Sequence, residues 1–216
     1  MFRKDYILRL VEDMTQMVAK VFVLRQQRKF TEALWEIDEL LGKDFRLNSR
    51  LLNSLSKEDL IDMFRFRDTL ESDKMQGVAR LLEEEGKIYT DMGESDEGLT
   101  RFMKSLHLFL YADNYGANRE LFDLHHQIEG LLERIKEYRL PSGTDQLLFV
   151  YLDKQGKYAE AENVLYRLLD QGEIDPMEGV SFYERLMQVD DDKLEQGRLP
   201  REEVVDGMKA MQLKMN

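Results

Sequence analysis

Residues 153–161 read Asp153-Lys154-Gln155-Gly156-Lys157-Tyr158-Ala159-Glu160-Ala161. Glycine readily adopts the left-handed backbone conformation that ends many helices, so Gly156 predicts the end of one helix and a short turn. Apolar residues recur every three or four positions on both sides of this turn, which is the periodicity of an amphipathic helix. These residues therefore predict two helices joined by a tight turn, with the small residue Ala161 buried where the helices cross.

Two further segments, 21–37 and 86–102, align without gaps with 149–165. In each, a small residue early in the second helix is followed four positions later by a large apolar residue: Ala33/Ile37, Gly98/Phe102 and Ala161/Leu165. A small side chain lets two helices approach closely, and the large one fills the groove between them. The copies recur at about twice the 34-residue period of one helix–turn–helix repeat. We interpret them as an internal repeat, and an irregular helical bundle is the alternative.

This pattern resembles the tetratricopeptide repeat. The resemblance rests on Asp153–Ala161 in the third copy and on Gly86, Tyr89, Gly93 and Phe102 in the second, whereas Arg28 replaces the usual turn glycine in the first. It implies antiparallel helical pairs stacked as a right-handed solenoid. Residues 5–12 and 30–34 also resemble an uncharacterised bacterial tetratricopeptide-like family, which implies a bacterial, cytoplasmic protein.

The periodicity extends over nearly the whole chain and predicts an all-α protein without a sheet. About eleven helices are expected, over 3–27, 30–42, 48–54, 57–69, 73–92, 95–112, 118–138, 144–154, 158–171, 177–189 and 201–213. No loop is long enough to separate domains, so a single helical-repeat domain over 1–216 is expected, with 176–216 as a C-terminal capping or association segment.

The last helix has a row of apolar residues at coiled-coil spacing: Val204, Met208, Met211 and Met215. This row could fold back on the preceding helical pair, or it could meet another chain. A monomer and a homodimer therefore both remain open.

Composition excludes several classes of function. The chain lacks cysteine, so it has no disulfide, zinc–cysteine site, iron–sulfur cluster or thiol nucleophile. A formal charge of −12 argues against nucleic acid as the main partner, because phosphate binding depends on Lys and Arg. Charged residues interrupt the apolar residues of 1–13, and no apolar run approaches a membrane-spanning length, so we expect neither a signal peptide nor a membrane partner.

We find no motif of an enzyme or of a cofactor site. The nucleophile elbow, the phosphate-binding loop and the dinucleotide fingerprint are all missing from the sequence, which predicts a non-enzymatic protein without a cofactor. Two weak metal patterns remain open. His125 and Glu129 lie one helical turn apart, with His107 as a possible third ligand. Residues 192–203 resemble an EF-hand loop, but Leu194 and Gln196 occupy positions that need oxygen ligands. Ordinary helix histidines and a plain turn at Gly197 explain both patterns.

The repeat register predicts which side chains line a concave face, because the first helix of each pair faces inward in such proteins. The candidates are Phe22, Arg25, Arg80, Glu83, Lys87, Thr90, Gln146, Val150 and Asp153. Arg80 and Lys87 could form an anion-binding spot, or they could be ordinary solvated cations. The predicted function is a protein- or peptide-binding scaffold. The alternatives are a peptide-responsive regulatory module and, less favoured, a metal-binding protein.

Overall fold

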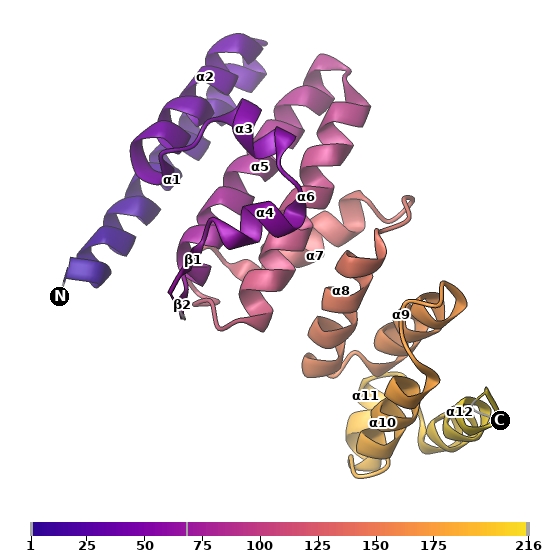
Figure 1. The fold of residues 1–216 in the computed structure, drawn as a ribbon. Helices are drawn as coiled ribbons and strands as arrows, with labels where there is room; N and C mark the ends of the chain where they lie inside the picture. Colours follow the sequence, from indigo (N-terminus) through magenta and orange to yellow (C-terminus); the bar gives the residue numbers. More distant parts are fainter. Residues whose placement is uncertain (1, 68, 215–216) are drawn as a thin grey trace. The chain divides into compact units, whose positions relative to one another are not determined.

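The computed structural model describes residues 2–67 and 69–214, and these residues are mostly α-helical, as predicted (Figure 1). They form two compact units, residues 1–139 (unit 1) and 140–216 (unit 2). The sequence analysis expected a single domain. The boundary falls in the connection 135–141, which is as short as an ordinary connection between two helices and therefore gave no signal of a division.

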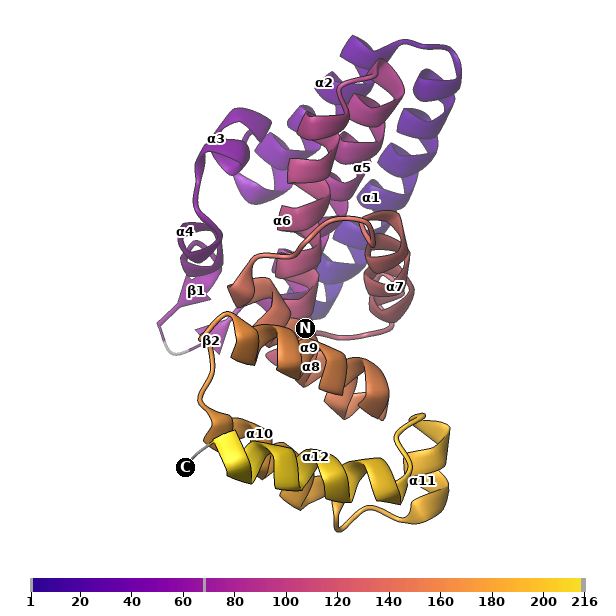
Figure 2. The same ribbon diagram turned by 90° about the vertical axis from the view of Figure 1, so that its right-hand side faces the viewer.

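Unit 1 contains the three longest helices of the described residues, with 25, 21 and 20 residues. Its elements are α1 (Phe2–Gln26), α2 (Phe30–Leu40), the π-helical turn η1 (Leu41–Phe45), α3 (Ser49–Ser54), α4 (Lys57–Asp62), the strands β1 (Arg65–Phe66) and β2 (Thr69–Leu70), α5 (Ser72–Met92), α6 (Ser95–Asn114) and α7 (Leu124–Arg134). In both views α1 lies at the edge of this unit, beside α2 and α5 (Figures 1 and 2).

Unit 2 consists of helices only within its described residues. These are α8 (Ser142–Lys154), α9 (Tyr158–Asp170), α10 (Pro176–Leu186), α11 (Asp191–Gln196) and α12 (Arg201–Lys214). All three prolines of the chain lie at or just before a helix start, where the missing N–H costs no hydrogen bond.

The three aligned segments each form two packed helices: α1 with α2, α5 with α6, and α8 with α9. Their turns share one geometry. The last turn residue before the second helix has nearly the same φ and ψ in all three, −90° and 64° at Lys29, −91° and 65° at Glu94, and −85° and 63° at Lys157. Its N–H donates to the carbonyl five residues earlier, the helix-ending bond of a Schellman motif. The preceding residue is left-handed in each copy: Arg28, Gly93 and Gly156.

The predicted packing of small against large residues is confirmed. Ala33 and Ala161 are fully buried, and so are the large partners Ile37 and Leu165. At Gly98, a Cβ atom would lie 2.6 Å from Oγ1 of Thr90 and 2.9 Å from the carbonyl of Gly86. The two long helices α5 and α6 are therefore close enough that only glycine fits at this crossing.

Three predicted boundaries are wrong. The helix expected over 57–69 ends at Asp62, because Phe64 turns into the core. The carbonyl of Phe64 accepts the N–H of Glu71, and this bond closes a small antiparallel hairpin of β1 and β2. No sheet was expected here. The helix expected over 118–138 begins only at Leu124, after turns that end in a left-handed Asp123. Residues 191–196, expected to be a loop, form α11.

The C-terminal helix α12 packs on α10 within unit 2. Val204 and Met211 are fully buried and Met208 is half-buried, while Met215 lies outside the described residues. Close approach depends on Gly207, where a Cβ atom would lie 2.5 Å from Cε1 of Tyr183. Of the two alternatives for the apolar row of the last helix, the described residues show the one in which it folds back on the chain.

Candidate functional site

Four of the six predicted inward-facing residues of unit 1 meet in one cluster of ion pairs. Arg25 comes from α1, and Arg80, Glu83 and Lys87 come from α5, where residues three and four apart share a face. Arg80 donates to Oε2 of Glu83 at 2.7 Å, and Lys87 donates to Oε1 of Glu83 at 2.6 Å.

Glu84, which the sequence analysis did not select, is the centre of this cluster. It is 3% exposed, and its Oε1 lies 2.8 Å from Nη2 of Arg80 and 2.9 Å from Nζ of Lys87. Arg25 binds Asp91 at 2.7 Å and lies 3.9 Å from Glu84. Arg80 also donates to Gln127, so the cluster connects α1, α5 and α7.

This arrangement counts against the anion-binding spot suggested for Arg80 and Lys87. The two cations are side by side, as predicted, but each is already bound by two carboxylates. With Arg25 and Asp91 included, three cations face three acids, and a bound anion would have to displace one of them. Ion pairs that share a partly buried network hold helices in register, and we assign this cluster a structural role.

Thr90 and Phe22 differ from the rest of the predicted set in unit 1. The Thr90 hydroxyl donates to the carbonyl of Gly86 at 2.8 Å, within its own helix, and lies where Gly98 of α6 crosses α5. Phe22 is 56% exposed on the surface of α1. It belongs to a larger apolar surface on α1.

Helix α1 has two apolar faces. Leu10, Met14, Met17 and Val21 are buried in the core of unit 1. A second row, about a third of a turn away around the helix, consists of Leu8, Val11, Thr15, Val18 and Phe22, which we call the outer face of α1.

The outer face of α1 is open within unit 1. Leu8 is 54% exposed, and Val11 and Val18 are half-buried. Thr15 is polar, but its hydroxyl donates to the Val11 carbonyl at 2.7 Å and therefore needs no hydrogen bond from a partner. The spacing of three, four, three and four residues is the a/d pattern against which a second helix packs.

The predicted site residues of unit 2 are placed separately. Gln146 donates to the carbonyl of Glu173 at 3.2 Å, and Asp153 pairs with Arg185 at 2.8 Å. Burial raises the pKa of Asp153, although Arg185 and Lys154 oppose the shift. Val150 is more than a third exposed. Gln146 and Asp153 thus have polar partners within unit 2, whereas Val150 is on its surface.

A groove that the sequence analysis did not predict lies on another part of unit 1. It has a volume of about 690 Å³ and is lined by residues of α2, the α3 region, α5 and α6: Leu34, Trp35, Asp38, Asn48, Ser49, Arg50, Asn53, Tyr89 and Arg101. Trp35, the single tryptophan of the chain, is 60% exposed on its rim. A signal existed in the sequence, since Trp35 stands among Glu32, Glu36 and Glu39, on the polar side of α2.

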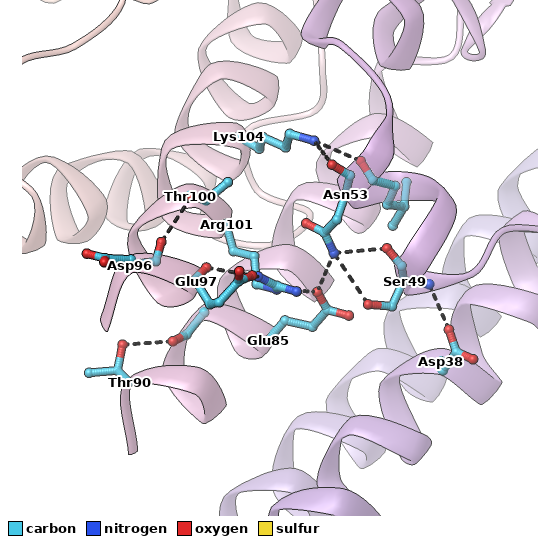
Figure 3. A network of polar contacts seen from close by, with 12 residues as sticks. Asp38, Ser49, Asn53, Glu85, Thr90, Asp96, Glu97, Thr100, Arg101 and Lys104 are labelled. Atoms are coloured by element: carbon cyan, nitrogen blue, oxygen red, sulfur yellow. Dashed lines mark hydrogen bonds and ion pairs between the residues drawn. The ribbon is translucent and has the colours of Figure 1, made fainter. Parts of the chain in front are cut away.

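A polar network forms the wall of this groove (Figure 3). Nε of Arg101 donates to Oε2 of Glu85 at 3.0 Å, and Nη1 binds Oε2 of Glu97 at 2.6 Å. The Arg101 guanidinium also lies 3.9 Å from the centre of the Tyr89 ring, a cation–π contact. Asn53 donates to the same Glu85 oxygen at 3.2 Å, which connects α3 to α5 and α6.

The network also fixes both ends of the short helix α3. Lys104 donates to the carbonyls of Leu52, Asn53 and Leu55 at 3.1, 2.7 and 2.9 Å, and so neutralises the C-terminal end of the helix. At the other end Asp38 accepts the N–H of Ser49 at 2.7 Å. A helix this short is unstable alone, and these contacts hold it at the groove.

The described residues contain no group of three His, Asp or Glu side chains that could hold a metal ion. His107 is buried at 5% exposure, while His125 and His126 lie on the exposed side of α7. In the EF-hand-like segment, residues 191–196 are helical, Leu194 is fully buried and Asp191 pairs with Arg201 at 2.7 Å. Leu194 therefore packs into the core of unit 2 and is not at a ligand position of a loop. Among the helices of residues 2–67 and 69–214, none has the length and apolar character to cross a membrane.

A family model described as "Family of unknown function (DUF6483)" matches residues 1–216. The chain belongs to this family. The match covers both units, so the division after residue 139 lies inside one family-wide unit of sequence. Comparison with curated proteins and with solved structures found no match.

Proposed function

We propose that this protein is a non-enzymatic scaffold that binds other proteins through the outer face of α1. The carrying observation is that α1 has two apolar faces and that unit 1 covers only one of them. Leu8 and Phe22, at its two ends, are both more than half exposed. Exposed apolar residues that gather in one row mark interaction surfaces more often than scattered ones do.

The spacing favours a helix as the bound element. Positions 8, 11, 15, 18 and 22 follow the a/d rule, and the row is about 21 Å long at 1.5 Å per residue. The occupant that fits is one amphipathic helix of a partner protein, which would insert its own apolar residues between these. A second copy of this chain is the outcome that light scattering would distinguish.

The three alike helical hairpins support the same proposal. Matching turns at residues 28, 93 and 156, with a small residue five positions later in each, are what a tetratricopeptide-like solenoid is built from. Proteins of that architecture bind partners along rows of helices. We propose the same for this protein, in the cytoplasm of a bacterium. No observation favours the regulatory or the metal-binding alternative over it.

The test is a matched pair of surface variants. Phe22→Glu places a charge at the C-terminal end of the proposed interface, whereas Tyr138→Glu places one at another exposed aromatic residue of unit 1, which is 50% exposed. Both variants should melt like the wild type, because substitutions at exposed positions change stability by less than about 0.5 kcal/mol. A partner recovered by the wild type and by Tyr138→Glu, and lost with Phe22→Glu, supports the proposal. Recovery that does not depend on Phe22 contradicts it.

A further inference from the structure

We infer that the groove beside Trp35 binds a proline-rich segment of a partner protein in the polyproline II conformation. The groove lies on α2, α3, α5 and α6, and none of its lining residues belongs to the outer face of α1. Its volume of about 690 Å³ is in the range of ordinary ligand pockets. Two features of the groove point to this ligand, an aromatic rim and an excess of unpaired hydrogen-bond donors.

The aromatic rim is formed by Trp35. This residue is 60% exposed, and its side chain makes no hydrogen bond and no ring contact within the described residues. The half-buried side chains of Leu34 and Tyr89 line the groove with it. Tryptophan and tyrosine are enriched among the residues that contribute most to binding in protein interfaces. The groove thus offers a flat aromatic surface to a partner.

The unpaired polar groups in the lining are mostly donors. The Trp35 indole N–H, the Asn48 amide nitrogen and the Arg50 guanidinium have no acceptor within the described residues. The Asn48 amide is held in this orientation, because its Oδ1 accepts the N–H of Leu51 at 2.8 Å. Indole, amide nitrogen and guanidinium can donate hydrogen bonds but cannot accept them. A ligand that pairs with them must bring acceptors.

Acceptors are scarce in the same lining. Within the described residues, Asp38 is the one acidic residue that lines the groove, and its Oδ1 accepts the N–H of Ser49 at 2.7 Å (Figure 3). An ordinary extended peptide brings a backbone N–H with nearly every carbonyl, and few of these donors would find a partner here. Proline has a carbonyl but no N–H. A proline-rich segment therefore supplies acceptors without adding donors that the groove leaves unpaired.

The rim favours the same ligand. Proline-rich segments dock in aromatic-lined grooves, and their polyproline II conformation is largely formed before binding, which lowers the entropic cost. This conformation has no internal hydrogen bonds, so its carbonyls are free to accept from the protein. The proline rings would pack on Trp35 and Tyr89 while the indole N–H donates to a carbonyl of the segment.

The charges in the lining favour neither a strongly acidic nor a strongly basic segment. The carboxylate of Asp38 opposes the guanidinium of Arg50. Arg101 is already bound by Glu85 at 3.0 Å and by Glu97 at 2.6 Å. A charged segment would meet one like charge whichever its sign, whereas a neutral proline-rich segment would meet none.

The experiment follows the intrinsic fluorescence of Trp35, the single tryptophan of the chain. The probes are capped hexapeptides of proline, of alanine and of sarcosine, each with a neutral polyethylene-glycol tail for solubility. Alanine adds the backbone N–H groups, and sarcosine, the N-methylated glycine, lacks both the N–H groups and the ring. We expect a saturable change in emission with the proline peptide, and binding weaker by about tenfold or more with the other two.

The same titration tests whether a charge is recognised instead. Two further peptides replace two of the six prolines by glutamate or by arginine, and neither should bind more tightly than the proline peptide. Tighter binding of either one, equal binding of the proline and alanine peptides, or no saturable change with the proline peptide would overturn the inference.

Variants of the groove complete the test, with calorimetry as the readout because one of them lacks the fluorophore. Trp35→Leu removes the aromatic rim at an exposed position and should weaken the proline peptide about tenfold or more. Arg50→Leu removes an exposed donor and should weaken it about threefold. The control is Tyr138→Leu, which changes an exposed aromatic residue outside the groove and should bind like the wild type. Unchanged binding by Trp35→Leu would contradict the inference.

Discussion

Arg28 occupies the same left-handed position in the turn between α1 and α2 that Gly93 occupies between α5 and α6. Their φ angles are 57° and 86°, and the following residue makes the same hydrogen bond in both turns. A residue with a Cβ atom costs roughly 1–2 kcal/mol in this conformation, a cost from which glycine is free. The first turn thus keeps the geometry of the others at the expense of stability.

Arg28→Gly is therefore expected to stabilise the protein. The gain should be about 0.5–1 kcal/mol, because the greater freedom of glycine in the unfolded chain offsets part of it. Gly93→Arg is the reciprocal variant and should destabilise by a similar amount. Urea denaturation measures both. A loss of stability with Arg28→Gly would show that the arginine side chain contributes more than its backbone costs.

Gly207→Ala tests the close approach of α12 to α10. The new methyl group would meet the Tyr183 ring, which is fully buried and donates to Glu162 at 2.5 Å, so it has no room to move. We expect a loss of about 2 kcal/mol from overpacking. The control is Gly130→Ala in α7, where a Cβ atom would meet nothing within 4 Å. That change should stabilise by up to about 1 kcal/mol through helix propensity alone.

The histidine buried in unit 1 predicts acid sensitivity. Burial, with help from Lys57 and against Glu58, lowers the pKa of His107 from 6.5 to about 4. A lowered pKa means that the folded state favours the neutral imidazole, whereas the unfolded chain takes up a proton near pH 6.5. The free energy of unfolding is therefore highest above pH 6.5 and falls as the pH decreases towards 4. The loss should be on the order of 3 kcal/mol across this range.

The pH dependence of the wild type should therefore be steeper than that of His107→Gln, which does not titrate. Urea denaturation at pH 7, 6 and 5 compares the two slopes, so a uniform loss of stability in the variant does not affect the conclusion. Parallel slopes would mean that His107 does not titrate differently in the two states.

Deletion of residues 200–216 tests the role of the C-terminal helix. It would uncover the faces of α10 that Val204 and Met211 bury, and the truncated protein should melt lower. Its association state by light scattering should equal that of the full chain, because the described contacts of α12 are internal. A stable truncated monomer derived from a full-length dimer would show that the helix is an interface.

Much of the fold followed from local signals. Turn glycines and 3.6-residue periodicity act within a few residues, so the hairpins around Gly93 and Gly156 were predictable, as was the burial of Ala161. The end of α4 was not, because it depends on Phe64 reaching the core. Helix α11 is only a turn and a half long and carries one buried residue, Leu194, which is too short for periodicity to appear.

The site residues were less predictable, because they depend on contacts between elements. The register placed Arg80 and Lys87 together, and the acids three and four residues away could have indicated that both are paired. The groove was beyond local reasoning, since Trp35 and Arg101 line one groove only when α2, α3, α5 and α6 are assembled. For the groove, the signal in the sequence was Trp35 on the polar side of α2. For the outer face of α1, it was Phe22, an apolar residue that does not belong to the buried row of its helix.

The central claim is that the outer face of α1 binds a helix of another protein. Site-specific photocrosslinking in cells tests it most directly, with a benzoylphenylalanine at position 22 and, as the control, at position 138. We predict an adduct of discrete mass from position 22, lost when Leu8→Glu is added, and none from position 138. The absence of an adduct at position 22, or the same adducts from both positions, would contradict the account.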